Sequence, residues 1–227
     1  PIKLTPGFQT FADGSVLIEQ GQTRVICSVS MEDRVPPFLR NSGTGWVTAE
    51  YAMLPRSTST RTPRDSTQGK ISGRSQEIQR LIGRSLRAVT DLSALGERSI
   101  MVDCDVVQAD AGTRTAAITG SYVALYLALD KLQRLGVIKQ IPLRSQVAAV
   151  SVSVYKGDIV LDPCFDEDCN ADSDFNLVMN SNGEFIEVQG TAERKSYTRS
   201  TIDMVLELAE KGIRNLFEIQ SAALQNR

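Results

Sequence analysis

The stretch Gln108-Ala109-Asp110-Ala111-Gly112-Thr113-Arg114-Thr115 decides how this chain is organised. The run Ile100–Val107 before it has the composition of a strand, and the run Ala116–Leu135 after it has the apolar pattern of a helix. A glycine at such a turn lets the backbone approach a ligand, and a helix start offers N–H donors with a partial positive charge. The Gly112-Thr113-Arg114 turn is therefore a candidate anion site, although an isolated turn of this kind is more often an ordinary helix start.

Composition restricts the chemistry that this chain can perform. None of its 227 residues is histidine, which removes Ser-His-Asp and Cys-His catalysis, histidine general bases and almost every catalytic zinc site. The carboxylate, arginine, lysine and hydroxyl groups that remain suit phosphate chemistry assisted by a hard metal ion. The formal net charge is −2, so any nucleic-acid binding must come from local basic patches.

The chain contains four cysteines, Cys27, Cys104, Cys164 and Cys169, with neither a Cys-x-x-Cys pair nor zinc-finger spacing. The first two lie in apolar strand-like runs and are predicted core residues. The sequence shows no signal peptide and no apolar run long enough to span a bilayer, and we expect a cytoplasmic protein. The chain begins at Pro1 rather than Met, so we expect upstream residues to be missing from this copy.

The segment Pro55–Arg74 is polar, long and basic. Its charged residues are one acid, Asp65, and five bases, Arg56, Arg61, Arg64, Lys70 and Arg74. Arginines among hydroxyl side chains can bind a phosphate backbone without reading bases. A structureless stretch of this length is either a functional loop or a flexible, solvated one, and composition alone does not decide between them.

Periodicity elsewhere predicts two successive β–β–β–α units with an extra strand and helix at the centre, which is an α+β organisation. The predicted strands and hairpins are Ser15–Met31, Gly43–Leu54, Val147–Leu161 and Phe175–Val188, and the further helices are Gln76–Leu92 and Thr198–Leu224. The chain is long enough for one domain or for two tightly joined halves. Arg74 precedes the helix Gln76–Leu92, where it can point at the same ligand as Arg114.

A second polar cluster is acidic. Its members are Asp162, Asp166, Glu167, Asp168, Asp172 and Asp174. Carboxylates this close raise one another's pKa unless a cation neutralises them, and oxygen ligands without histidine favour Mg²⁺ or Mn²⁺. Acidic runs alone are usually solvated loops. A chain that also carries two arginine-rich elements has the parts of a phosphoryl-transfer site, with arginines for phosphate and aspartates for a metal ion or a proton.

Many stretches of the chain match one family in the right order. They are Gly45–Tyr51, Met53–Thr58, Gly73-Arg74, Glu77–Arg84, Asp103–Val106, Gln108–Thr115, Glu167-Asp168, Asp174–Asn176 and Glu187–Glu193. With these motifs the sequence resembles the ribonuclease PH family of phosphate-dependent 3′-to-5′ exoribonucleases. The resemblance implies a single ribonuclease PH domain over residues 1–227, with an α+β fold similar to domain 2 of ribosomal protein S5.

The resemblance also implies an activity. The chain would trim the 3′ ends of tRNA precursors, with inorganic phosphate as co-substrate and nucleoside 5′-diphosphates as products, and the transfer would be reversible. The implied cofactor is Mg²⁺ or Mn²⁺, and the implied assembly is a homohexameric ring built from dimers. RNA is therefore the expected partner.

The matched positions assign roles to individual residues by the same resemblance. The phosphate-binding residues are Arg74, Thr113 and Arg114, together with Gly112 of the turn. The catalytic, metal-associated residues are Asp168 and Asp174. The residues that hold the tRNA are Arg56, Arg61 and Arg64. Cys169 and Phe175 depart from the serine and methionine usual in the family, but both aspartates are retained.

Two alternatives remain open from the sequence. One is a non-catalytic RNA-binding subunit of a ring, which would be expected to lose either the anion turn or the aspartates. The other is a metal-dependent hydrolytic nuclease that uses water. Whether RNA degradation requires added phosphate separates all three functions.

Overall fold

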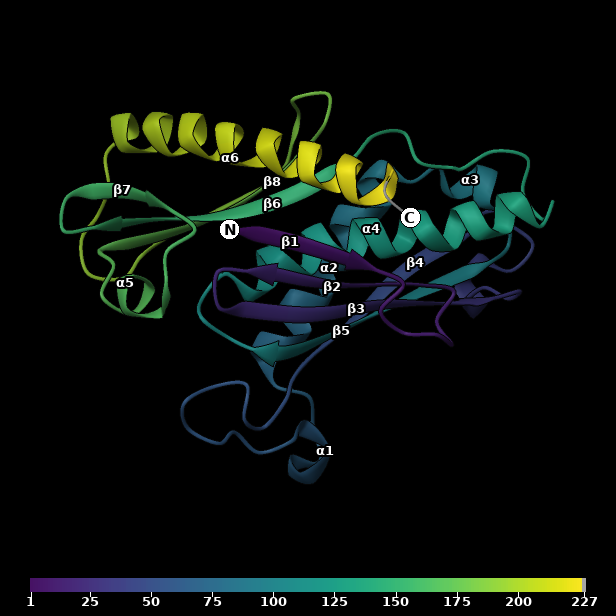
Figure 1. Ribbon diagram of the computed structural model, residues 1–227, viewed down its shortest axis with the longest axis horizontal. Helices are drawn as coiled ribbons and strands as arrows, with labels where there is room; N and C mark the ends of the chain where they lie inside the picture. The colour runs from purple at the N-terminus through teal and green to yellow at the C-terminus, as the bar shows by residue number, and fades with distance from the viewer. Residues whose placement is uncertain (226–227) are drawn as a thin grey trace.

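A computed structural model describes residues 1–225, which form two β-sheets and six α-helices (Figure 1). The first sheet has five strands in the order β1-β2-β3-β5-β4. Their bounds are β1 Ile2–Pro6, β2 Gly14–Gln20, β3 Thr23–Glu32, β4 Trp46–Met53 and β5 Ser99–Gln108. Neighbouring strands are antiparallel except β4 and β5, which are parallel because helix α2 crosses between them.

Helix α2 (Gly73–Val89) packs on β4 with the apolar face that the sequence predicts. It begins at Gly73 because the Ser72 hydroxyl accepts a hydrogen bond from the Ser75 N–H at 3.1 Å and caps the first turn. Arg74 therefore lies within the first turn of α2. The sequence had predicted that it precedes the helix. The short helices of this half are η1 Pro37–Leu39, α1 Asp65–Gln68 and α3 Leu92–Leu95.

The second sheet has four antiparallel strands in the order β7-β6-β8-β9. Their bounds are β6 Val147–Tyr155, β7 Asp158–Leu161, β8 Ser173–Asn180 and β9 Phe185–Ala192. The two predicted hairpins are confirmed, with turns at Lys156-Gly157 and around Asn182-Gly183. Helix α6 (Arg199–Gln225) lies along this sheet, against β6, β7 and β8, and also contacts β1 of the first sheet (Figure 1).

Helix α4 (Thr113–Arg134) lies between the two sheets, against β2 and β3 on one side and β6 on the other. It is buried almost all round from Thr113 to Leu125, whereas the sequence predicted a single wide apolar stripe. The approach is close, since a Cβ atom at Gly120 would lie 2.9 Å from the Cys27 Sγ. Cys27 itself is fully buried, which confirms its prediction as a core residue.

Strand β6 shows how the two sheets become one folded unit. Val147 and Ala149 belong to the hydrophobic cluster around α4, while Ala148 and Val150 belong to the cluster beneath α6. A strand covered on both faces carries apolar residues at successive positions, as this run does. The core therefore continues from the first sheet through α4 into the second sheet.

The α+β prediction is confirmed, with several elements added. Strand β1 adds a fourth strand ahead of α2, and four strands also precede α6 in the second half. The basic segment is not structureless, because it contains α1, and the acidic segment contains α5 (Phe165–Cys169). Within residues 1–225, no helix combines the length and apolar character needed to cross a membrane.

Candidate active site

A pocket of about 270 Å³ lies where the two halves of the chain meet. It is polar throughout, and both halves supply its walls. The lining residues are Arg74, Glu77, Gly112, Thr113, Arg114, Ser151, Asp168, Asp174, Asn176, Gln189, Thr191 and Glu193. The structure thus brings together all the residues assigned to phosphate and both aspartates assigned to catalysis.

The phosphate turn, residues 110–114, joins β5 to α4 in a constrained conformation. Ala111 and Gly112 both have left-handed backbones, with φ values of 59° and 58°, so α4 begins at Thr113. The Thr23 hydroxyl donates to the Ala111 carbonyl at 2.7 Å and accepts from the Asp110 N–H at 2.9 Å. Strand β3 thereby holds both sides of the turn, and the first N–H groups of α4 lack intrahelical partners.

Arg114 is the most firmly oriented cation of the pocket. Its Nη1 donates to the Gln189 Oε1 at 2.8 Å and to the Glu77 Oε1 at 3.1 Å, and its side chain is only 14% exposed. The Gln189 Nε2 donates to the same Glu77 oxygen at 3.0 Å. The hydrogen bond from Gln189 lowers the pKa of Glu77, and the Arg114 charge adds to this effect. The three side chains therefore fix one another across α4, α2 and β9.

The Thr113 hydroxyl is not free to contact a phosphate. Its side chain is buried, and its Oγ1 is hydrogen-bonded to the Tyr51 Oη at 2.7 Å. Burial raises the pKa of Tyr51, so this phenol stays protonated. The Thr113 hydroxyl therefore ties the helix start to β4, and only the backbone N–H of Thr113 is left available to an anion.

Asp168 and Asp174 face the same pocket from α5 and β8. Burial, followed by the neighbouring charge of Asp174, raises the pKa of Asp168. Burial also raises the pKa of Asp174, although a 2.9 Å hydrogen bond from the Ser153 hydroxyl opposes this effect. The negative charge of Glu193 also raises the pKa of both aspartates. The site therefore favours a bound cation or a proton shared between the two carboxylates.

The remaining acids of the predicted cluster lie elsewhere. Glu167 caps the start of α5 by accepting a hydrogen bond from the Cys164 N–H at 2.9 Å. Asp172 forms an ion pair with Lys195 at 3.1 Å. Neither they nor Asp162 and Asp166 line the pocket. Of the six acids that are close in the sequence, two therefore line the pocket, and four have other contacts or positions.

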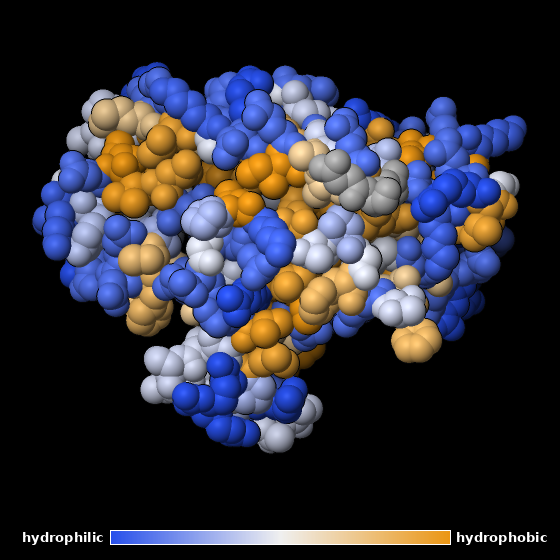
Figure 2. Space-filling view, viewed as in Figure 1, coloured by the Kyte–Doolittle hydropathy of each residue, from blue (hydrophilic) through white to orange (hydrophobic). Residues whose placement is uncertain are grey.

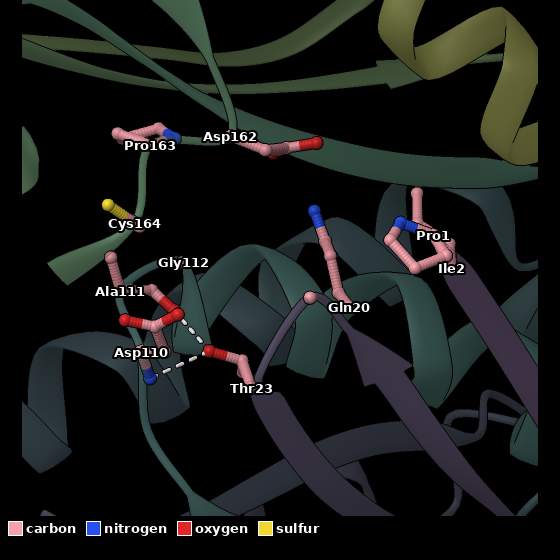
Figure 3. A pocket seen from close by; sticks show the side chains of 11 residues that line it. Pro1, Ile2, Gln20, Thr23, Asp110, Ala111, Gly112, Asp162, Pro163 and Cys164 are labelled. Carbon is pink, nitrogen blue, oxygen red and sulfur yellow. Dashed lines mark hydrogen bonds between the residues drawn. The ribbon is translucent and has the colours of Figure 1, made fainter.

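Asp162 lines a separate cavity of about 230 Å³ on the other side of the phosphate turn (Figure 3). Its backbone is left-handed, with φ of 49°. Burial raises its pKa to about 6, against the opposing hydrogen bonds of the Ser151 N–H and the Gln20 side chain. Figure 3 also shows the two Thr23 hydrogen bonds that hold the turn. This cavity therefore lies behind the turn, and Thr23 in its wall holds the turn in place.

The two aspartates suit a hard metal ion only in part. Within residues 1–225, no group of three or more His, Cys, Asp or Glu side chains is placed to hold a metal ion. Mg²⁺, however, is commonly held by one or two carboxylates together with substrate phosphates and waters. Asp168 and Asp174 fit that mode, in which the substrate completes the coordination.

Arg56, Arg61 and Arg64 lie outside the pocket. They belong to the arginine loop, residues 55–72, which extends from the body of the molecule together with α1 (Figure 1). All three side chains are exposed, and the Arg56 Nη1 donates within the loop to the Ser59 carbonyl at 2.9 Å. Arg64 nevertheless lines a neighbouring cavity of about 430 Å³ together with Arg74, which also lines the pocket.

Two models of the 3′ exoribonuclease family match the chain, domain 1 over residues 1–129 and domain 2 over residues 145–212. The chain belongs to this family. It is 72% identical over 225 residues to a protein named ribonuclease PH from Dehalococcoides mccartyi strain CBDB1, covering 99% of this chain and 93% of that one. It is 59% identical to a ribonuclease PH from Syntrophomonas wolfei, covering 98% and 93%.

Solved structures of much lower identity share the fold. Rice (Oryza sativa) Rrp46 superposes with a TM-score of 0.79 at 19% identity, covering 99% of this chain and 94% of that one. A chain of the Archaeoglobus fulgidus exosome with RNA bound to the active site gives 0.82 at 20% identity, covering 96% and 87%. The family recognised from the sequence motifs is confirmed, and with it the assignment as an exoribonuclease of the phosphorolytic class.

The sequence did not assign roles to Glu77, Gln189, Glu193 or Ser153. The first three lie inside motifs that carry the family resemblance, so the signal was present, but no rule of spacing places them near Arg114 or the aspartates. Glu77 and Gln189 are 112 positions apart and still exchange a hydrogen bond. Only the packing of the second sheet against α2 and α4 brings them together.

Proposed function

We propose that this pocket removes nucleotides one at a time from RNA 3′ ends, with inorganic phosphate as the nucleophile and nucleoside 5′-diphosphates as products. The observation that carries the proposal is the arrangement of opposite charges in one pocket. Arg74, Arg114 and the start of α4 line the same pocket as Asp168 and Asp174. A site of this kind suits the meeting of two anions, which repel one another unless fixed positive groups offset their charge.

The phosphate turn would hold the attacking phosphate. The guanidinium of Arg114 matches two phosphate oxygens at once, and the N–H groups at the start of α4 add donors. One phosphate oxygen attacks the phosphorus of the last phosphodiester, and the bond from that phosphorus to the 3′ oxygen of the preceding nucleotide breaks. A phosphoanhydride bond forms as the phosphodiester bond breaks, and because the two bonds are similar in energy, the reaction also runs backwards from nucleoside diphosphates.

The departing 3′ oxygen needs a proton. Asp168 and Asp174 are the acids beside it, and their raised pKa values favour a protonated member of the pair more than isolated aspartates would. When both are ionised, the two residues would instead hold Mg²⁺ or Mn²⁺, which would supply positive charge at the scissile phosphate. Glu193 stands close enough to influence both.

The arginine loop would hold the body of the RNA. Arg56, Arg61 and Arg64 are exposed on a projecting segment, and such contacts to phosphates position a nucleic acid without reading its sequence. A tRNA precursor with a single-stranded 3′ end fits both regions. We place this activity in the cytoplasm.

Residues 1–227 act in this proposal as a single ribonuclease PH domain, since the core is continuous between the two parts that the family models match. We further propose a homohexamer built as a trimer of dimers. Sedimentation at enzymatic concentrations should show the hexamer, and a stable, fully active monomer would contradict it.

The decisive experiment is RNA degradation with and without phosphate. Shortening should require added phosphate and release nucleoside diphosphates. Nucleoside monophosphates formed in phosphate-free buffer would indicate a hydrolytic nuclease instead. RNA binding without any shortening, with phosphate and Mg²⁺ supplied, would indicate a non-catalytic ring subunit.

A further inference from the structure

A groove of about 570 Å³ continues from the catalytic pocket toward the arginine loop. The pocket and the groove share four lining residues, so they meet at the phosphate turn. These are Arg74, Gly112, Thr113 and Asp168. Loop hydroxyls such as Thr60 line one side of the groove, and the start of α5 lines the other. In Figure 2 the outline of the molecule is indented between its main body and the projecting lobe that carries the loop.

One aromatic ring stands in this passage. Of all the described residues that line the pocket or the groove, Phe165 is the only aromatic one. Its side chain is 52% exposed, although it neighbours the charged residues Arg74 and Asp168 along the groove. Exposure alone would not set Phe165 apart, because singly exposed apolar side chains are normal on protein surfaces; its place in the wall of a groove that leads to the polar pocket does.

The backbone beneath this ring is fixed to the phosphate turn. The Asp110 Oδ1 accepts a hydrogen bond from the Phe165 N–H at 2.9 Å. The Asp110 N–H is in turn bonded to the Thr23 hydroxyl at 2.9 Å. The backbone of Phe165 is therefore fixed relative to the phosphate turn, so the base of the ring needs little reordering when a ligand covers it.

We propose that the Phe165 ring is a stacking platform for a base near the RNA 3′ end. This inference rests on the proposed function, because RNA that joins the catalytic pocket to the arginine loop must pass through the groove. Every base has a π-face, so stacking binds any sequence, which suits an enzyme that removes successive nucleotides. Stacking needs an unpaired base, so the ring also favours single-stranded 3′ ends over paired ones.

The first test compares Phe165→Leu and Phe165→Trp with the unchanged enzyme, using a short single-stranded RNA at saturating phosphate. Base–aromatic stacking of ordinary strength predicts that Phe165→Leu raises the KM for RNA about tenfold. The KM for phosphate should change much less. Phe165→Trp keeps an aromatic face and should therefore retain most of the affinity for RNA. If Phe165 served only as apolar packing, an aromatic replacement would have no advantage over leucine.

The second test removes the base rather than the ring. RNAs lacking the base of the last, the second-last or the seventh-last nucleotide are compared in the unchanged enzyme and in Phe165→Leu. One of the two abasic sites nearest the end should weaken binding by the unchanged enzyme about tenfold, with little further loss in Phe165→Leu. The abasic site far from the end should affect both proteins equally. Phe11→Leu is the matched control, because Phe11 is fully exposed and lines neither cavity.

Two results would overturn the inference. One is an unchanged KM for RNA in Phe165→Leu. The other is an equal loss of affinity for intact and abasic RNAs, which would show that the ring acts without meeting a base. Both results are distinct from a failure of the proposed function, which would be a lack of phosphate-dependent shortening by the unchanged enzyme.

Discussion

The phosphate turn and the arginine loop both present positive charge, but they are built in opposite ways. The turn is held by side chains from β3, α2 and β9, through Thr23, Glu77 and Gln189. The loop is held mainly by bonds within itself, such as the Thr62 N–H to the Pro55 carbonyl at 2.9 Å and the Arg56 bond to Ser59. The turn is fixed by the rest of the molecule, and the loop is fixed mostly within itself, with the Ala109 N–H bond to the Ser57 carbonyl at 2.8 Å joining it to the body.

The difference teaches where rigidity is needed. Charge that stabilises a transition state must be in place before the reaction, because reorganisation during the reaction costs part of its benefit. Charge that holds the backbone of an RNA acts over several phosphates and tolerates adjustment. We therefore expect substitutions in the pocket to change catalysis and substitutions in the loop to change RNA affinity.

The largest effect is expected from Asp174→Asn. The amide retains an acceptor for the Ser153 hydroxyl, so the fold should remain, but the negative charge and the acidic proton are lost. Turnover should fall by a factor of about 10² or more, as for other well-placed acid–base or electrostatic groups. The measurement is kcat for phosphorolysis beside tRNA affinity, which should remain nearly intact. Near-normal turnover would move the catalytic role to another residue, with Glu193 the nearest candidate.

Arg114 should show the next largest effect. Arg114→Ala removes the two-point contact to phosphate, and we expect the KM for phosphate to rise by about 10² while tRNA affinity changes little. Arg114→Lys should restore little, because an ammonium cannot bond Glu77, Gln189 and phosphate in the same fixed geometry. Titrating phosphate at saturating RNA measures the effect. A loss of tRNA affinity in Arg114→Ala, in place of a raised KM for phosphate, would show that the turn and the loop form one binding site.

Asp110 tests whether rigidity itself matters. Asp110→Ala removes the acceptor for the Phe165 N–H and frees the start of α5, which carries Asp168. Turnover should fall about tenfold, and the metal concentration needed for half-maximal activity should rise, because Asp168 is less firmly placed. Asp110→Asn keeps the Oδ1 acceptor and should retain most of the activity. Equal losses of turnover in both variants would show that activity depends on the negative charge of Asp110 and not on its hydrogen bond to the start of α5.

The smallest effect is expected in the loop. Arg61→Ala should weaken tRNA binding severalfold and lower the salt dependence of affinity by roughly one unit of slope per lost phosphate contact. Cleavage of a short oligonucleotide at saturating phosphate should be almost unchanged. Binding titrations over a series of salt concentrations provide the measurement. If Arg61→Ala and Arg114→Ala change the same constant, either tRNA affinity or the KM for phosphate, by similar factors, then the loop and the turn do not have separate roles.

The sequence by itself determined most of the elements and the chemistry. Local patterns located the hairpins and long helices, because side-chain periodicity reports which face is buried. The absence of histidine restricted the reaction, and the ordered motifs identified the family. The turn at Gly112 was found because a glycine before a helix has a local physical meaning.

Only the tertiary structure decided which residues share the site. Nothing in the spacing of Arg114, Glu77 and Gln189 predicts their mutual hydrogen bonds, because contact between distant segments depends on how two sheets pack around α4. The acidic run looked uniform along the chain, yet the fold directs Asp168 and Asp174 into the pocket and leaves Asp162 behind the turn. Electrostatic environment is set by burial and by neighbours in space, and the order of residues along the chain does not contain it directly.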